Sequence, residues 1–248
     1  MSGHSKWHNI RLRKGKVDAQ RGALFTKLSK EIILAARSGS PDPEANYRLK
    51  MAIEKARENN MPMDNIKRAI ARATGAEKGS EIEEIRYEGY GPGGVAVLVD
   101  AATDNRNRTA GELRFLFSKH GGTLGETGSV AWIFDPVGVL EIDPAGASED
   151  RLLELALVDG ALDLEYGEPV TLLYTEPTML SAVRDALVQR GVRVTAAYLG
   201  ARAKVKAQPP KEQLPAVLAF LEALEDHEDV QRVFSNLDVA DAELAALA

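Results

Sequence analysis

The chain has 248 residues, of which 44% are hydrophobic and 27% are charged, as in an ordinary globular protein. It contains no cysteine, which excludes disulfides, thiolate metal ligands and a cysteine nucleophile. The N-terminal residues lack the apolar stretch of a signal peptide, and no segment approaches the roughly 20 apolar residues of a membrane helix. We therefore expect a cytoplasmic protein with no membrane partner.

Three helices are predicted in the first third of the chain. Residues 1–16 have little periodic apolar character and are expected to form an arm. Apolar residues at helical spacing then predict helices over about 18–38, 43–59 and 64–74. Asp18 is the expected cap of the first, Pro43 the expected start of the second, and Gly75 the expected stop of the third. Three short helices with short connections predict a small bundle.

An α+β pattern follows this bundle. Strands are predicted over about 83–88, 95–101 and 129–134, and a helix over 110–119. Thr109 and Glu112 form a capping-box pattern at the start of that helix. A helix over 214–224 and a strand over 230–236 are expected to complete this unit.

The segment between these parts has its own order of elements. Strands are predicted near 137–142, 161–166, 170–175 and 192–199, and helices near 149–158 and 177–190. That order is ferredoxin-like. The predicted fold is therefore α+β: an N-terminal three-helix domain (1–79), followed by two ferredoxin-like α+β domains, one inserted in the other. The outer one comprises residues 80–136 plus 203–248, and the inserted one residues 137–202.

The net charge of −6 conceals two segments of opposite charge. Residues 1–80 hold 17 Lys and Arg against 8 Asp and Glu, a net charge of +9, so residues 81–248 have a net charge of −15. Such an asymmetry is typical of a basic module carried on an acidic body. The basic module indicates a nucleic-acid partner, and the acidic body is a candidate surface for protein partners.

The basic module supplies most of the candidate nucleic-acid-binding residues. In the arm and at the start of the first helix these are Lys6, Trp7, His8, Arg11, Arg13, Lys14, Lys16 and Arg21. Lys and Arg neutralise phosphates, and a tryptophan can stack on an unpaired base. On the third helix the apolar stripe leaves Lys67, Arg68 and Arg72 on the outside. The alternative is a solvated basic surface, with Trp7 packed on the bundle.

Two polar loops of the next domain are secondary candidates. Residues 89–94 match G-x-G-x-x-G, but a strand follows them where a dinucleotide site requires a helix, so a tight glycine turn is favoured. Residues 103–109 lie before a helix, where Arg106 and Arg108 are able to contact phosphate. The alternative for this loop is a turn organised by its own Asp and Asn side chains.

Nothing in the sequence supports catalysis. His4 and His8 lie in a glycine-containing arm without an acidic partner, and the spacing of Asp100, Asp104 and Glu112 does not define an acid–base pair. We therefore predict a protein that is not an enzyme, with no catalytic residues, no cofactor and no metal.

Six motifs together resemble the YebC/PmpR family, whose mitochondrial relatives include the translational activator of cytochrome c oxidase subunit I. They are MSGHSKW (1–7), KGK (14–16), NNMP (59–62), GYGPGGVA (89–96), TDNRNRT (103–109) and GETGSVAW (125–132). The resemblance spans nearly the whole chain, but none of the six motifs lies within residues 137–199. It implies three domains, one helical and two α+β.

The resemblance also implies a regulator of gene expression, described for most members as a probable transcriptional regulator that binds DNA. Other members resemble translation factors that act on the ribosome and relieve stalls at consecutive prolines. No helix-turn-helix recognition element is evident in the sequence, and a basic arm with a tryptophan suits irregular RNA at least as well as a major groove. DNA, ribosomal RNA with its ribosome, and a protein-interaction scaffold therefore remain as alternatives.

Overall fold

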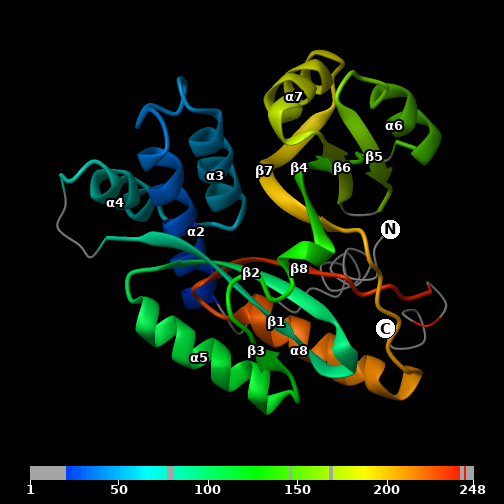
Figure 1. The fold of residues 1–248 in the computed structure, drawn as a ribbon. Coiled ribbons are helices and arrows are strands. Elements are labelled where there is room, and N and C mark those ends of the chain that lie inside the picture. The colour runs from blue at the N-terminus through cyan, green and yellow to red at the C-terminus, as the bar shows by residue number, and fades with distance from the viewer. Residues whose placement is uncertain (1–20, 77–80, 146, 168–169, 241–242, 244–248) are drawn as a thin grey trace.

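The structure is a computed structural model that describes residues 21–76, 81–145, 147–167, 170–240 and 243. Within this part, three helices precede two four-stranded antiparallel sheets, each with its own helices (Figure 1). The predicted α+β class is therefore confirmed.

The helical domain consists of α2 (Arg21–Arg37), α3 (Tyr47–Glu58) and α4 (Met63–Ala73). Their apolar stripes meet in one core, which contains Leu28, Ile32, Leu49, Ile53 and Ile66.

The predicted start of the second helix at Pro43 is wrong. Asn46 caps α3, because its side-chain oxygen accepts a hydrogen bond from the backbone N–H of Leu49 at 3.0 Å. Its amide group also donates to the carbonyl oxygens of Ala35 and Ser40. Asn46 thus ties the connection between α2 and α3 to the end of α2, and residues 41–46 are left outside the helix.

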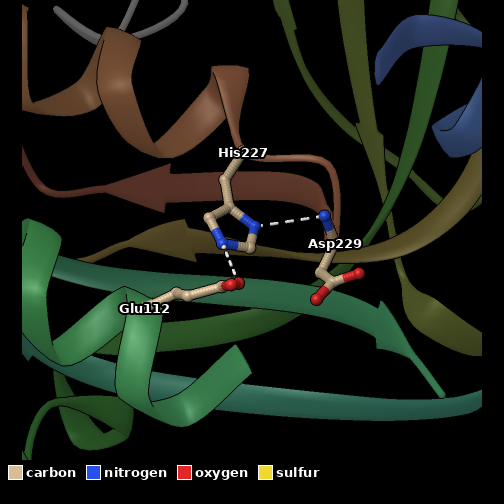
Figure 2. A group of neighbouring side chains, drawn as sticks. All are labelled: Glu112, His227 and Asp229. Atoms are coloured by element: carbon tan, nitrogen blue, oxygen red, sulfur yellow. Dashed lines mark hydrogen bonds and ion pairs between the residues drawn. The ribbon is translucent and has the colours of Figure 1, made fainter. Parts of the chain in front are cut away.

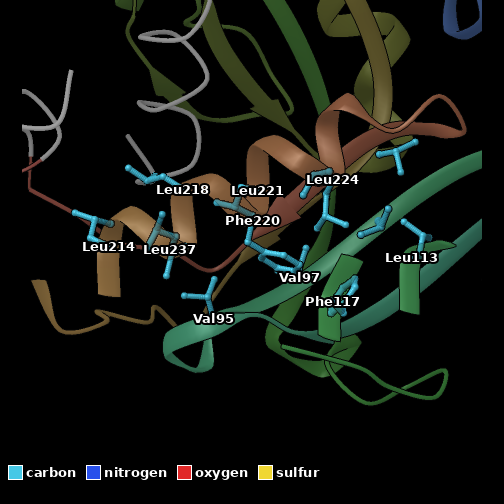
Figure 3. Packing of buried hydrophobic residues seen from close by; sticks show 14 of the residues in the cluster. Val95, Val97, Leu113, Phe117, Leu214, Leu218, Phe220, Leu221, Leu224 and Leu237 are labelled. Atoms are coloured by element: carbon cyan, nitrogen blue, oxygen red, sulfur yellow. The ribbon is translucent and has the colours of Figure 1, made fainter. Parts of the chain in front are cut away.

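The first sheet has the strand order β3-β1-β2-β8. Its strands are β1 (Glu83–Tyr90), β2 (Ala96–Thr103), β3 (Thr123–Leu124) and β8 (Val230–Ser235). Helices α5 (Arg106–Lys119) and α8 (Leu214–Asp226) pack on one face of it, around Phe117 and Phe220 (Figure 3). Ala102 of β2 contributes to the core of the helical domain. Strand β8 pairs with β2, so residues from the end of the chain join a sheet whose other strands lie within residues 83–124.

The second sheet has the order β5-β6-β4-β7, the order of a ferredoxin-like βαββαβ unit. Its elements are β4 (Phe134–Asp143), α6 (Glu149–Leu155), β5 (Ala161–Glu165), β6 (Thr171–Thr175), α7 (Leu180–Gln189) and β7 (Arg193–Ala203). The first sheet is also antiparallel with two helices on one face, but its chain order begins with the β1–β2 hairpin.

The strand predicted over 129–134 is wrong. A short 3-10 helix, η2 (Ala131–Ile133), occupies half of it, and the extended backbone begins at Phe134 as the start of β4. Two of the apolar residues that suggested a strand, Val130 and Ile133, are buried without strand pairing. They lie in a small core between the two sheets, with Phe134 and Ala201.

Candidate nucleic-acid interface

The basic arm lies outside the described residues. This applies to Lys6, Trp7, His8, Arg11, Arg13, Lys14 and Lys16, whereas Arg21 is the first residue of α2. The basic residues of the helical domain that the structure describes lie on α2, α3 and α4.

Most described cations of α2 and α3 are engaged with acidic or carbonyl groups. Lys27 donates to the carbonyl oxygen of Glu225 at the end of α8. Arg37 pairs with Glu81, and Arg48 with Glu84 at 2.9 Å. The opposite charges seen in the sequence therefore serve in part to hold the helical domain on the acidic body.

Helix α4 differs from α2 and α3 in what it presents to solvent. Ile66 and Ala69 are buried against α2, and this orientation leaves Lys67 and Arg68 exposed on the opposite side. Arg72, predicted to lie outside, is only partly exposed. Residues 59–62 join α3 to α4, so the two helices follow each other across a short turn.

The loop 103–109 is shorter than predicted, and the capping box at Thr109 is wrong. Helix α5 begins at Arg106, and Asn105 is its cap, with its side chain accepting from the backbone N–H of Arg108 at 3.1 Å. The Thr109 hydroxyl is used elsewhere, in a 2.6 Å hydrogen bond to Asp229. Arg106 is exposed at the N-terminus of α5. The alternative interpretation, a turn organised by its own Asn side chain, describes this segment.

Arg108 pairs with the buried carboxylate of Asp229, although its own side chain is 38% exposed. Its Nη2 lies 2.9 Å from the Asp229 carboxylate, which also accepts from Thr109 and forms an ion pair with Lys30 of α2. Burial by itself raises the pKa of Asp229, but the hydrogen bonds from Lys30, Thr109 and Arg108 outweigh it and lower that pKa to about 2. Arg108 thus joins α5 to the loop before β8 and to the helical domain, and its contact with phosphate, which would compete with this ion pair, stays a prediction.

Glu112, His227 and Asp229 lie close enough together to be tested as a metal site (Figure 2). The Nδ1 atom of His227 accepts from the backbone N–H of Asp229 at 3.1 Å, so Nε2 carries the proton and points at Glu112 at 3.0 Å. The Asp229 carboxylate is already occupied by Lys30, Arg108 and Thr109. The trio is therefore a hydrogen-bonded structural network, and its donor atoms do not fit a metal ion.

A second charged network, which sequence analysis did not identify, joins the helical domain, the first sheet and the second sheet. Glu31 of α2 accepts from Lys55 of α3 and from Arg232 of β8, and Arg232 stacks on the ring of Tyr198 in β7. Burial raises the pKa of Glu31, but Lys55 and Arg232 together lower it below its ordinary value. Residues as distant in sequence as Glu31 and Arg232 carry no local signal that could have identified their pairing.

Among the described residues, no helix combines the length and the apolar character needed to cross a membrane.

Comparisons with known proteins cover both halves of the chain. A sequence model of the TACO1/YebC protein N-terminal domain matches residues 5–76, and one of the TACO1/YebC second and third domain matches residues 82–237. A probable transcriptional regulatory protein of Desulfitobacterium hafniense is 49% identical, over 98% of this chain and 97% of its own length. Another of that description, from Chloroflexus aurantiacus, is 51% identical, with 99% and 98% covered. The crystal structure of a conserved hypothetical protein from Aquifex aeolicus is 46% identical with a TM-score of 0.84, covering 91% of this chain and 93% of that one.

Proposed function

The chain belongs to the TACO1/YebC family, and on that premise we propose that it regulates gene expression by binding nucleic acid through its basic N-terminal domain, without catalysing a reaction. The proposal places its action in the cytoplasm.

The observation that carries the proposal is the distribution of positive charge. Residues 1–80 have a net charge of +9, although Lys27, Arg37 and Arg48 of α2 and α3 are engaged with the body. The proposed grip consists of the arm, Arg21, the exposed Lys67 and Arg68 of α4, and the exposed Arg106. Such cations bind the phosphate backbone and provide affinity without sequence preference.

DNA is the proposed target, because the similar proteins of Desulfitobacterium hafniense and Chloroflexus aurantiacus are named probable transcriptional regulatory proteins. The short turn 59–62 between α3 and α4 also suits presentation of one helix to a groove, with Lys67 and Arg68 on the presented helix.

Ribosomal RNA is the second candidate, and it would make the protein a translation factor acting on the ribosome. The observation that favours it is the exposed indole of Trp132, since unpaired bases of RNA stack on such rings. A role as a protein-interaction scaffold would instead use the acidic body.

Salt titration tests the proposal. We expect duplex DNA or ribosomal RNA to bind at low salt, and the double substitution Lys14→Gln, Lys16→Gln to reduce the slope of log K against log salt by about 0.9 per lost phosphate contact. The control is Arg151→Gln, Lys211→Gln, which removes two exposed cations of the body.

If neither DNA nor ribosomal RNA binds at low salt, the proposed function is refuted. If the double substitution leaves the slope of log K against log salt unchanged, the role of the arm is refuted. Crosslinking in cells followed by sequencing distinguishes the two targets: promoter fragments support transcription, and ribosomal RNA supports translation.

A further inference from the structure

The loop 125–132 is fixed by one buried carboxylate. Glu88 of β1 is 4% exposed, and its two oxygens accept from the backbone N–H groups of Gly128, Val130 and Ala131 at 2.7–2.9 Å. Gly125 packs so closely on this loop that a Cβ atom there would lie 2.5 Å from the Ser129 hydroxyl oxygen. The backbone of the loop is therefore held in one conformation by groups of the protein itself.

This fixed loop carries an exposed tryptophan. Trp132 is 60% exposed, although its Nε1–H donates to the carbonyl oxygen of Ser129 at 3.1 Å. Tyr90, 37% exposed at the end of β1, donates its hydroxyl to the same oxygen at 3.5 Å. Both polar donors are thus used internally, and the two side chains converge on one atom. What they offer to a partner is the apolar surface of two aromatic rings whose positions are set.

A glycine turn begins at the residue after Tyr90. The N–H of Gly91 donates to the carbonyl oxygen of Val95 at 2.8 Å and closes the turn, and Gly93 and Gly94 are exposed with φ of 69° and 72°. Turns of this kind present successive backbone amides, which can bind an anion such as phosphate.

A cation lies next to η2, the short helix that contains Trp132. Lys204 is held beside η2 by the hydrogen bond of its backbone N–H to the carbonyl oxygen of Ile133 at 3.0 Å. Its ammonium group pairs with Asp135 at 3.0 Å, with both side chains about half exposed, and such surface pairs are weak enough to exchange for a phosphate.

We propose that Trp132 and Tyr90 form a stacking site for an unpaired nucleotide of RNA, with the glycine turn 91–94 and Lys204 beside it to receive the phosphates. The inference rests on the second form of the proposed function, binding of RNA, and names the partner of a surface formed by the end of β1 and the loop 125–132. A base suits this site because stacking needs only the face of an aromatic ring. The Trp132 Nε1–H and the Tyr90 hydroxyl already donate to the carbonyl oxygen of Ser129, which leaves the ring surfaces for the partner. The site therefore discriminates single strands from duplexes, in which the base faces are covered by their neighbours.

Intrinsic fluorescence gives a direct test, since Trp7 and Trp132 are the only two tryptophans. In the full chain carrying Trp7→Phe, all tryptophan emission comes from Trp132. We expect a single-stranded oligoribonucleotide to quench this emission and a duplex of the same sequence to leave it unchanged. Binding of both is measured in parallel by the anisotropy of labelled RNA.

Substitution gives a second readout. Trp132→Ala should weaken binding of the single strand by roughly tenfold, the effect of losing one stacked base, and Trp132→Phe should restore most of it. The control is Phe115→Ala, which removes an aromatic ring of similar exposure, 65%, from α5 and should leave the affinity unchanged.

The outcomes separate this inference from the proposed function. Binding of RNA without quenching, equal quenching by the duplex, or equal losses for Trp132→Ala and Phe115→Ala would overturn the stacking site and leave the proposed function standing. Quenching by a proline-rich peptide and not by RNA would identify a protein-binding patch instead. Absence of binding to RNA and to DNA would overturn both proposals.

Discussion

Replacement of Asp229 by asparagine tests the junction between the helical domain and the first sheet. Asparagine has nearly the same shape, so the change removes the charge and leaves the packing. The side chain of Lys30, 9% exposed, then lies beside a neutral amide, and Arg108 loses its main partner. Breaking a buried ion pair in this way costs about 3–5 kcal/mol, so we expect the free energy of unfolding to fall by that amount.

The dependence on pH provides an independent measure of the same interaction. The pKa of Asp229 is lowered from 3.8 to about 2 in the folded protein, so its stabilisation is complete above the unfolded pKa and is lost as the pH falls toward 2. This lowering of the pKa from 3.8 to about 2 corresponds to a contribution of about 2 kcal/mol to the free energy of unfolding. We therefore expect the unfolding free energy of the wild type to decline between about pH 5 and pH 2, with a shallower decline in Asp229→Asn.

Urea denaturation at fixed ionic strength, repeated across this pH range, measures both effects. The matched control is Glu84→Gln, which breaks the half-exposed pair with Arg48 and should cost no more than about 1 kcal/mol. Equal losses for Asp229→Asn and Glu84→Gln would refute the reasoning, as would an acid limb that is identical in the wild type and in Asp229→Asn.

Three further tests concern the loop, the close packing of β1 and the candidate interface. In Glu88→Gln the loop 125–132 loses charge-assisted hydrogen bonds, which should cost about 1–3 kcal/mol and speed hydrogen exchange at Gly128, Val130 and Ala131; protected amides would contradict this. Gly89→Ala places a Cβ atom 2.5 Å from both Phe117 and the Thr123 carbonyl oxygen, which should lower the free energy of unfolding by at least about 1–3 kcal/mol. Gly111→Ala lies in open space within α5 and should raise the free energy of unfolding by about 0.5–1 kcal/mol. Equal thermal shifts for the two variants would refute the packing argument. The double substitution Lys67→Gln, Arg68→Gln should weaken nucleic-acid binding and flatten its salt slope by up to about 0.9 per contact, and a slope equal to that of the wild type would remove α4 from the interface.

Local pattern was sufficient for most elements, but it failed where a side chain had a distant partner. The apolar stripes of α4 and α8 agree with the predicted helices to within a few residues, and Gly75 follows α4 as expected. Helix α2 ends at Arg37, close to the predicted end, whereas the predicted cap Asp18 lies outside the described residues. The start of α5 was placed four residues late because Thr109 matched a capping pattern, whereas its hydroxyl bonds Asp229, 120 residues away in sequence. At 129–134 the apolar residues were identified, but their burial between two sheets imposes a 3-10 turn on part of the predicted strand.

The sequence by itself determined the periodicities, the order of the elements and the separation of a basic segment from an acidic one, because each depends on residues a few positions apart or on composition alone. The tertiary structure decided which charges remain for a partner. Lys27, Lys30 and Arg108 are used to hold the domains together, while Lys67 and Arg106 face solvent. It also decided that Trp132 is exposed on a fixed loop, since the carboxylate that fixes it comes from another strand. Such pairings join residues tens to hundreds of positions apart, and only the folded chain brings them within hydrogen-bonding distance.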